Sequence, residues 1–298
     1  DLPTDRPRPA RQSMIGATAD FSIPARIHAA LLEIAVANDA SLFMVVHAAL
    51  AVLLSRSSGS SDVSIGSPVS GRGERQLDDV VGMFVNTVVL RTTVDPDRSF
   101  PEILSHTRSV DLEAFSNTDL PYERLVDELK PTRSEAHSPL FQVMLVLQGF
   151  ANTRLELPGL DVEVEALETG AAKFDLQVIL TEHTEGSGAP GAIDVQFSYA
   201  SELFDPPTMT ALAERFVTLL ETITAGSDAK VGDIDLIGAD ETHRMLEQWI
   251  HTDVAVPDSA TLVSLFEEQV ARTPDAVAVV FAEEELLYAE FDARANRL

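Results

Sequence analysis

The sequence contains 298 residues and no cysteine, and its 21 Lys and Arg against 48 Asp and Glu give a formal net charge of −27. This length is typical of about two domains. The acidic balance argues against nucleic acid and anionic membranes as partners, because both attract clustered Lys and Arg. Without cysteine, disulfides and zinc–thiolate sites are excluded as well, and a cytoplasmic location is expected.

The first part of the chain is predicted to contain a linker and two helices. Residues 1–12 carry several prolines and arginines and are expected to form an extended linker. Ser22 is the expected N-cap of a helix that runs to about Asn38, and Ser41 begins a second helix. This second helix is apolar nearly all round, which predicts burial, but its longest apolar run, 42–54, is too short to span a bilayer.

The middle of the chain is predicted to mix helices with strands. Ser99 and Glu102 have capping-box spacing, Pro121 is placed to start another helix, and 207–223 forms a long helix. Segments rich in β-branched and other apolar residues predict strands at 63–69, 85–94, 141–147, 160–167, 174–181 and 193–199. Because helices and strands alternate irregularly, the expected fold class is α/β, with helices around one mixed sheet.

The composition changes after Gly226, where Gly, Asp, Ser and Pro become frequent. We therefore predict a linker at 226–260 that contains one short helix, 240–249. A second unit is expected to follow, with a helix, a strand and another helix at 261–271, 277–281 and from 287 onward. The predicted domain division is thus 1–12, 13–225, 226–260 and 261–298.

No catalytic centre is evident from the residues themselves. None of the seven histidines is adjacent to another, and each is interpreted as a surface or hydrogen-bonded core residue. The metal-binding HExxH, nucleophile-elbow GxSxG, phosphate-binding GxxxxGK[ST] and dinucleotide-binding GxGxxG patterns do not occur. The residues alone therefore predict no bound cofactor and no metal site.

Several motifs resemble those of one family. VGMFVNTVVLR, 81–91, is similar to the condensation-domain motif [IV]GxFVNTxxxR of nonribosomal peptide synthetases and meets every fixed position. IGSPVSGR, NTDLPYE and RSEAHSPLFQV, at 65–72, 117–123 and 133–143, resemble the neighbouring motifs of that family. KFDL, 173–176, resembles a late strand, and LLYAEF, 286–291, resembles the opening motif of an adenylation domain. The chain therefore resembles part of a peptide synthetase.

The resemblance implies a specific arrangement of domains. Residues 13–225 would be the chloramphenicol-acetyltransferase-like second, C-terminal lobe of a condensation domain, and 1–12 the linker between its two lobes. Residues 226–260 would join it to 261–298, the truncated beginning of an adenylation domain. The catalytic HHxxxDG motif belongs to the first lobe, so no catalytic residue is expected in this chain. The chain alone is accordingly expected to be inactive.

The resemblance also implies the partners. In this family, donor and acceptor peptidyl carrier domains bring thioesters on phosphopantetheine arms into a tunnel between the two lobes, where an amide bond forms. This chain would supply one tunnel wall and a carrier-docking surface. The N-terminal lobe and the remainder of the adenylation domain are the other expected partners, and ATP and Mg would bind only to a complete adenylation domain.

Five residues are candidates for the tunnel or for the structure of the motifs. Asn117 occupies the [HN] position of its motif and is the candidate for a tunnel role. Asn86 and Thr87 either contact substrate or hydrogen-bond backbone groups at a lobe junction. Arg72 either meets a phosphopantetheine phosphate or forms an ion pair with a nearby carboxylate. Asp119 is expected to interact with a helix dipole.

Two other functions are compatible with the same sequence. The chain could belong to a noncatalytic scaffold that uses the lobe only to dock carrier domains. Alternatively, it could come from a stand-alone acyltransferase of the same fold, although the adenylation-like tail argues against that. The amino acids joined and the final product are not encoded in any motif that we identify.

Overall fold

The computed structural model describes residues 2–73, 75–77, 79–132, 134–148, 170–186, 188–226, 229–248, 261–282 and 284–297. The chain divides into two compact units, Asp1–Gly238 (unit 1) and Ala239–Leu298 (unit 2). Among the described residues, each unit has its own sheet, with six strands in unit 1 and two in unit 2.

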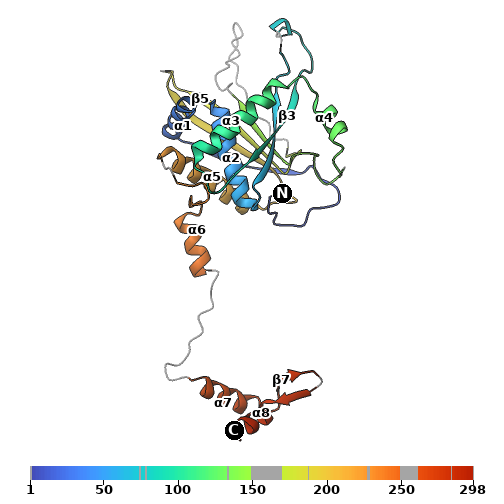
Figure 1. Cartoon of the computed structure of the whole chain (residues 1–298), viewed down its shortest axis with the longest axis vertical. Coiled ribbons are helices and arrows are strands. Elements are labelled where there is room, and N and C mark those ends of the chain that lie inside the picture. The colour runs from blue at the N-terminus through green and yellow to red at the C-terminus, as the bar shows by residue number, and fades with distance from the viewer. Residues whose placement is uncertain are drawn as a thin grey trace. The chain divides into compact units, whose positions relative to one another are not determined.

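The sheet of unit 1 is mixed and has the strand order β1-β6-β5-β4-β2-β3. Its strands are β1 (Gly16–Ile23), β2 (Asp62–Val69), β3 (Asn86–Thr93), β4 (Val143–Gln148), β5 (Leu176–Thr184) and β6 (Pro190–Ala200). Strand β4 runs parallel to both of its neighbours, whereas the other pairs are antiparallel. The predicted mixed α/β sheet is confirmed (Figure 1).

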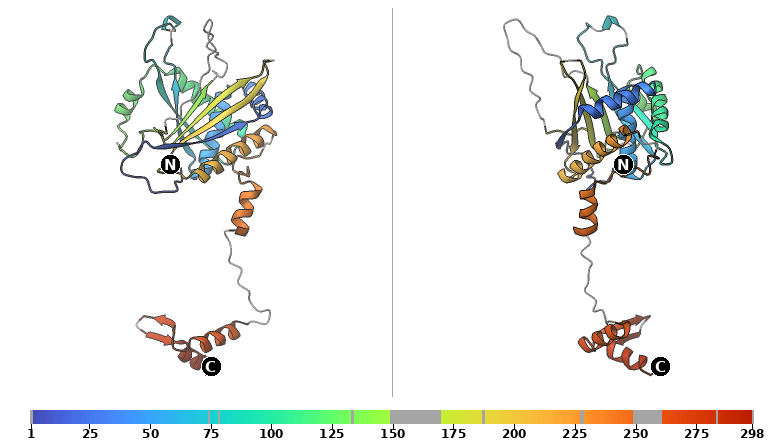
Figure 2. Two further views of the ribbon diagram at one scale, coloured as in Figure 1. Left: turned by 180° about the vertical axis from the view of Figure 1, so that it is seen from behind. Right: turned by 90° about the vertical axis from the view of Figure 1, so that its left-hand side faces the viewer.

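Four helices of unit 1 pack on the sheet and on one another, which places them on the same face (Figures 1 and 2). They are α1 (Ala25–Ala37), α2 (Leu42–Ser58), α3 (Phe100–Ser116) and α5 (Pro206–Thr224). A fifth, short helix, α4 (Tyr122–Leu129), lies beside β3 at the edge of the sheet (Figure 1). A 3₁₀ turn, η1 (Arg75–Leu77), lies in the β2–β3 connection.

Helix α2 is the centre of the core, as its all-round apolar sequence predicts. Val45, Leu50 and Leu53 are fully buried, and Gly59, in a left-handed conformation, ends the helix. Among the described residues, no single helix is long and apolar enough to span a membrane. Only α1 and α2 together have the length and composition, and they meet at 104°.

The prediction that Ser22 starts a helix is wrong. Ser22 lies in strand β1, which was not predicted, and Pro24 is the N-cap of α1. Residues 17, 19, 21 and 23 alternate along β1 and pair with the aromatic and aliphatic residues of β6. The small side chains of Gly16, Ala17 and Ala19 hide this alternation, because alanine is not typical of strands.

The other elements of unit 1 agree with prediction to within a few residues. The Glu102 carboxylate accepts hydrogen bonds from the Ser99 backbone N–H and hydroxyl, each at 2.9 Å, at the start of α3. Strands β5 and β6 extend into the predicted loop between them, with a register shift between Glu182 and Thr184. The strand predicted at 160–167 lies outside the described residues.

Part of the segment predicted as a linker packs on unit 1. Val231 and Ile234 are buried, and the Arg56 guanidinium donates to both of their carbonyl oxygens, at 2.6 and 3.1 Å. The Val231 N–H donates to the Arg98 carbonyl at 2.8 Å. Unit 1 thus extends to Gly238. The domain boundaries that we predict at residues 225 and 260 stay predictions.

Unit 2 contains a hairpin and short helices. Its elements are α6 (Ala239–His243), the π-helix η2 (Arg244–Gln248), α7 (Leu262–Arg272), β7 (Val277–Phe281), β8 (Glu284–Leu287) and α8 (Tyr288–Ala295). Strand β8, which pairs antiparallel with β7, was not predicted. The helix expected from Leu287 begins at Tyr288, because Leu287 still pairs with Val277.

Candidate functional site

The candidate site is the face of the sheet that α1, α2, α3 and α5 do not cover. Side chains alternate across a strand, so residues beside the buried Ile193, Val195 and Phe197 of β6 point to this face. A groove of about 670 Å³ lies here, and its lining includes Asp20, Ser22, Gln148, Ile179, Thr181, Asp194 and Gln196. Sequence reasoning missed this groove, although the polar alternation at 194, 196 and 198 marks it.

Six of the nine residues that line the groove are polar, and two of these carry carboxylates. Gln196 Nε2 donates to Asp20 Oδ1 at 2.9 Å, which links β6 to β1 across the groove. His183 Nε2 lies 2.7 Å from Asp194 Oδ2. These contacts orient amide, carboxylate and imidazole groups on one surface, which suits hydrogen bonding to a polar substrate chain.

Aromatic rings occupy another part of the same face. Ile65 points into the helix-covered core, so Gly66 has the opposite orientation, and a Cβ there would lie 2.3 Å from the Phe141 ring. The Phe141 ring centroid is 5.7 Å from that of Tyr122 and 5.3 Å from that of Phe174. Four motifs distant in the sequence therefore meet here, and only glycine leaves room for Phe141.

Tyr122 fixes this cluster through its hydroxyl. The hydroxyl donates to the Pro139 carbonyl, and burial raises the pKa of the Tyr122 phenol above its ordinary value. The phenol therefore stays protonated near neutral pH and remains a donor. Tyr122 thereby holds α4 against the segment that leads into β4.

Asn86 joins β3 to the connection between α3 and α4. Its Nδ2 donates to the carbonyl oxygens of Thr118 and Leu120, at 2.9 and 2.8 Å. Its Oδ1 accepts from the backbone N–H groups of Thr87 and Tyr122, at 2.8 and 3.0 Å. All four hydrogen-bonding positions of the amide are therefore used by backbone groups, which supports the structural interpretation of Asn86, whereas both interpretations of Thr87 stay predictions.

Asn117 and Asp119 lie at the exposed rim of the same connection. Asn117 is the C-cap of α3, and its Nδ2 donates to the Glu113 carbonyl at 2.8 Å and to the Ser116 hydroxyl at 3.2 Å. Asp119 lies two residues before the Pro121 N-cap of α4, where a negatively charged carboxylate interacts favourably with the positive end of the helix dipole. The amide nitrogen of Asn117 thus supports its own helix.

Arg72 contacts the segment that follows it. Its guanidinium donates to the carbonyl oxygens of Leu77 and Val80 and lies 4.4 Å from the centroid of the Phe84 ring. Phe84 belongs to the FVNT motif, so Arg72 holds the loop between β2 and β3 in place. Both the phosphate-binding and the ion-pair hypotheses for Arg72 stay predictions.

The histidines among the described residues are not clustered. His47 Nδ1 lies 2.8 Å from Asp111 Oδ1 and its Nε2 lies 3.4 Å from the Thr92 hydroxyl. This resembles a catalytic triad in composition, but all three side chains are fully buried in the core. In the described part of the chain, no group of His, Asp and Glu is arranged to hold a metal ion.

Comparison with known families defines the class of protein. The model of the condensation domain family matches residues 1–246, and the chain belongs to this family. The chain is 43% identical over 298 residues to the dimodular nonribosomal peptide synthase of Bacillus subtilis (strain 168), a match that covers 100% of the chain and 12% of that protein. Peptide synthetases are therefore its relatives.

Solved structures agree with the observed fold. The X-domain from teicoplanin biosynthesis is 30% identical, with a TM-score of 0.74, and the match covers 79% of this chain and 53% of that one. A four-domain nonribosomal peptide synthetase bound to AMP and glycine has a TM-score of 0.77 at 19% identity, covering 97% of this chain and 22% of that one. The second likeness establishes the fold alone.

The chain is much shorter than the curated relatives it matches. It spans between 4% and 12% of the length of eight such proteins, among them synthetases for gramicidin and tyrocidine. The products of those whole proteins are therefore not assigned to this chain. The activity in which this chain takes part is proposed below.

Proposed function

We propose that unit 1 is the C-terminal lobe of a condensation domain that forms an amide bond between two carrier-bound thioesters in a peptide synthetase. The observation that carries the proposal is the assembly of the family-like motifs on the uncovered face of the sheet. There, the rings of Tyr122, Phe141 and Phe174 bring motifs from distant parts of the chain together around Gly66. We propose that this face is one wall of the substrate tunnel.

In the proposed reaction, the amine nitrogen of the acceptor bonds to the thioester carbonyl carbon of the donor. The carbon–sulfur bond breaks, and the amine proton ends on the released thiol. A wall that orients two tethered chains converts a bimolecular reaction into a nearly intramolecular one, which lowers the barrier. This lobe contributes orientation, and the N-terminal lobe with its HHxxxDG motif contributes the catalytic histidine.

We assign the residues of the motifs to two roles. Arg72, Asn86 and Thr87 hold the wall together through backbone hydrogen bonds, and Asp119 acts on the dipole of α4. Asn117 is proposed to orient substrate, because its Nδ2 is used within α3 while the contacts among the described residues include none to its Oδ1. An amide oxygen at this exposed rim is an acceptor suited to an amine.

We propose that residues 261–298, in unit 2, begin an adenylation domain. Its described residues leave apolar side chains exposed, with Leu262 at 88%, Val263 at 64% and Phe281 at 80%. Such a surface favours packing against further protein, in this proposal the remainder of the adenylation domain. ATP and Mg would bind to the complete domain, so amino-acid-dependent exchange of ATP and pyrophosphate is not expected from this chain.

The proposed partners are therefore the N-terminal condensation lobe and the donor and acceptor carrier domains with their phosphopantetheine arms. A noncatalytic docking function is the second candidate. One observation favours it: a solved relative of this fold, the X-domain from teicoplanin biosynthesis, forms a complex with OxyB. A lobe used only for docking would bind carrier domains in the parent protein without affecting the rate of amide formation.

The two candidates are separated by substitutions in the parent synthetase. Asn117→Ala should lower the condensation rate about tenfold, the scale of one lost hydrogen bond of about 1.4 kcal/mol. Amino-acid activation and carrier loading should not change. The matched control is Asn86→Ala, which should mainly lower the melting temperature, because its amide contacts backbone groups only. An unchanged condensation rate for Asn117→Ala would show that Asn117 has a structural role and does not orient substrate.

A further inference from the structure

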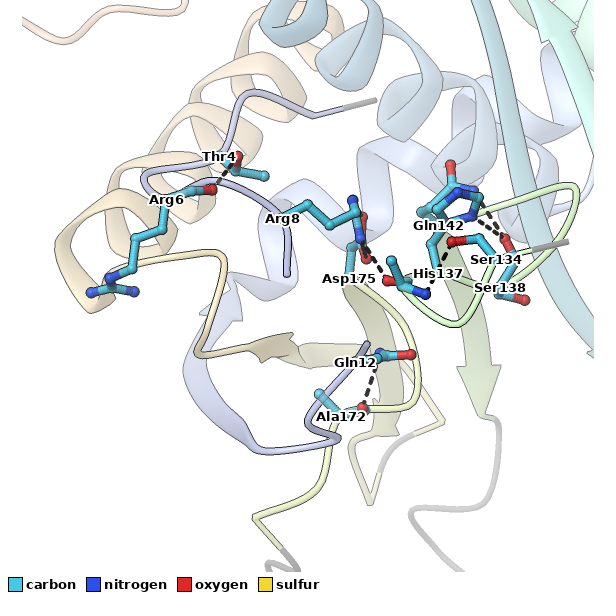
Figure 3. A network of polar contacts seen from close by, with 11 residues as sticks. Thr4, Arg6, Arg8, Gln12, Ser134, His137, Ser138, Gln142, Ala172 and Asp175 are labelled. Atoms are coloured by element: carbon cyan, nitrogen blue, oxygen red, sulfur yellow. Dashed lines mark hydrogen bonds and ion pairs between the residues drawn. The ribbon is translucent and has the colours of Figure 1, made fainter. Parts of the chain in front are cut away.

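Residues 2–13, which precede β1, lie across one end of unit 1 as an extended strap (Figure 3). The strap is attached along its length. The Asp5 N–H donates to the Leu203 carbonyl at 2.9 Å, and the Gln12 N–H donates to the Glu135 carbonyl at 2.9 Å. The Ser13 N–H donates to the Glu202 carboxylate at 3.0 Å. A segment predicted to be a linker is therefore bound to the lobe.

The Asp5 end of the strap caps a helix of the lobe. Asp5 accepts from the Asp205 backbone N–H at 2.7 Å and from the Thr208 hydroxyl at 2.9 Å, at the start of α5. Arg6 pairs with the Asp205 carboxylate, but these two side chains are 47% and 45% exposed. An exposed pair of this kind contributes little to stability.

Arg8 makes a different kind of contact. Its guanidinium binds both oxygens of Asp175, with 2.8 Å between Nη1 and Oδ1, and also donates to the Ala136 carbonyl at 3.2 Å (Figure 3). The Asp175 side chain is only 3% exposed. Bidentate guanidinium–carboxylate pairs are strong and directional. Without Arg8, the Asp175 carboxylate would be buried and unpaired, which proteins tolerate poorly.

The position of Asp175 connects the strap to the candidate site. Asp175 lies between Phe174, a member of the aromatic cluster, and Leu176, the first residue of β5. Ala136, the other partner of Arg8, lies in the segment that leads to Phe141. One side chain of the strap therefore holds together two segments that place rings on the uncovered face.

We propose that Arg8 and Asp175 form a lock that fixes the strap to this lobe and thereby positions the preceding lobe over the uncovered face. This inference rests on the proposed function, in which residues 1–12 join the two lobes. Arg8 and Asp175 are positioning residues, since neither lies in the groove. Without the lock, the strap detaches and the two lobes are no longer held in a fixed position relative to each other. The two thioesters are then no longer aligned for reaction.

The attachment of the strap is tested by trypsin on the 298-residue chain. Trypsin does not cut before proline, so Arg6 and Arg8 are resistant and the exposed Arg11 reports detachment. Arg8→Met should raise the rate of cutting after Arg11 about tenfold or more. The matched control, Arg6→Gln, should leave that rate within about twofold. Equal rates in wild type and Arg8→Met would overturn the lock.

The positioning role is tested in the parent synthetase by the condensation rate and the melting temperature. Arg8→Met should lower both, with the rate reduced about tenfold. Arg8→Met combined with Asp175→Asn removes the unpaired buried charge, so the melting temperature should recover while the rate stays low. If the condensation rate of the double variant recovered together with its melting temperature, Arg8 and Asp175 would have a structural role only. Absence of amide formation by the wild-type parent would instead refute the proposed function, and the trypsin result would still stand.

Discussion

In unit 1, helix α2 is buried from Leu42 to Leu54 except for Phe43, whereas no described residue of unit 2 is buried. Unit 2 has the sequence features of a folded segment: Thr261 forms a capping box with Ser264, and Phe266 packs against Phe291 at 5.3 Å. Local hydrogen bonds and the aromatic contacts of Phe266 with Phe291 and Tyr288 define its elements, but they remove little apolar surface from water. Burial of apolar surface is the dominant favourable term in folding, so unit 1 should carry nearly all of the chain's own stability.

The largest expected effect tests this contrast by truncating one leucine in each unit. Leu50→Ala should lower the free energy of unfolding by about 2–5 kcal/mol, because Leu50 is fully buried in α2 and its loss leaves a cavity. Leu262→Ala should change it by less than about 0.5 kcal/mol, since Leu262 is 88% exposed. Urea unfolding of both variants measures the difference. Equal losses would show that unit 2 has a core of its own.

A smaller effect is expected where the aromatic cluster meets the sheet. Gly66→Ala should destabilise unit 1 by about 1–3 kcal/mol, because the new Cβ would lie 2.3 Å from the buried Phe141 ring. Gly73→Ala is the control, since no atom lies within 4 Å of a Cβ built there. Thermal unfolding followed by circular dichroism compares the two. A Gly66→Ala variant as stable as Gly73→Ala would contradict the close packing of this face.

The smallest expected effect concerns an exposed contact of unit 1. The Ser99 N–H and hydroxyl lower the pKa of Glu102, so its ionised form stabilises the folded state. This contribution is present above the ordinary glutamate pKa of about 4.3 and is lost as pH falls through the lower, folded-state pKa. Glu102→Gln should therefore be slightly less stable than wild type at pH 7 and equally stable at low pH. A difference independent of pH would contradict this origin.

The sequence predicted the core of unit 1 better than its candidate site. Helix α2 and the strands β2, β3 and β4 were predictable because runs of apolar and β-branched residues report burial directly. Strand β1 was not, because Ala17 and Ala19 lack the side chains typical of strands. The motifs identified Asn86 and Asn117 and offered backbone hydrogen bonding as one of two alternatives for Asn86, but they did not indicate which backbone groups its amide contacts.

Contacts between distant segments account for the rest of the difference. Arg8 and Asp175 are 167 residues apart, and the rings of Tyr122 and Phe174 meet through Phe141. No periodicity along the chain reports such pairs, since they depend on the order of strands in the sheet. The polar groove depends likewise on residues of β1, β4, β5 and β6 becoming neighbours.

Amide formation by the purified chain tests the central claim most directly, namely that unit 1 is one lobe of a condensation domain and acts only with its partner lobe. Donor and acceptor carrier domains, each loaded with a thioester, would be mixed with the 298-residue chain or with the parent synthetase. We predict amide product with the parent and none above the uncatalysed background with the chain alone. Product formed by the chain alone would contradict the account.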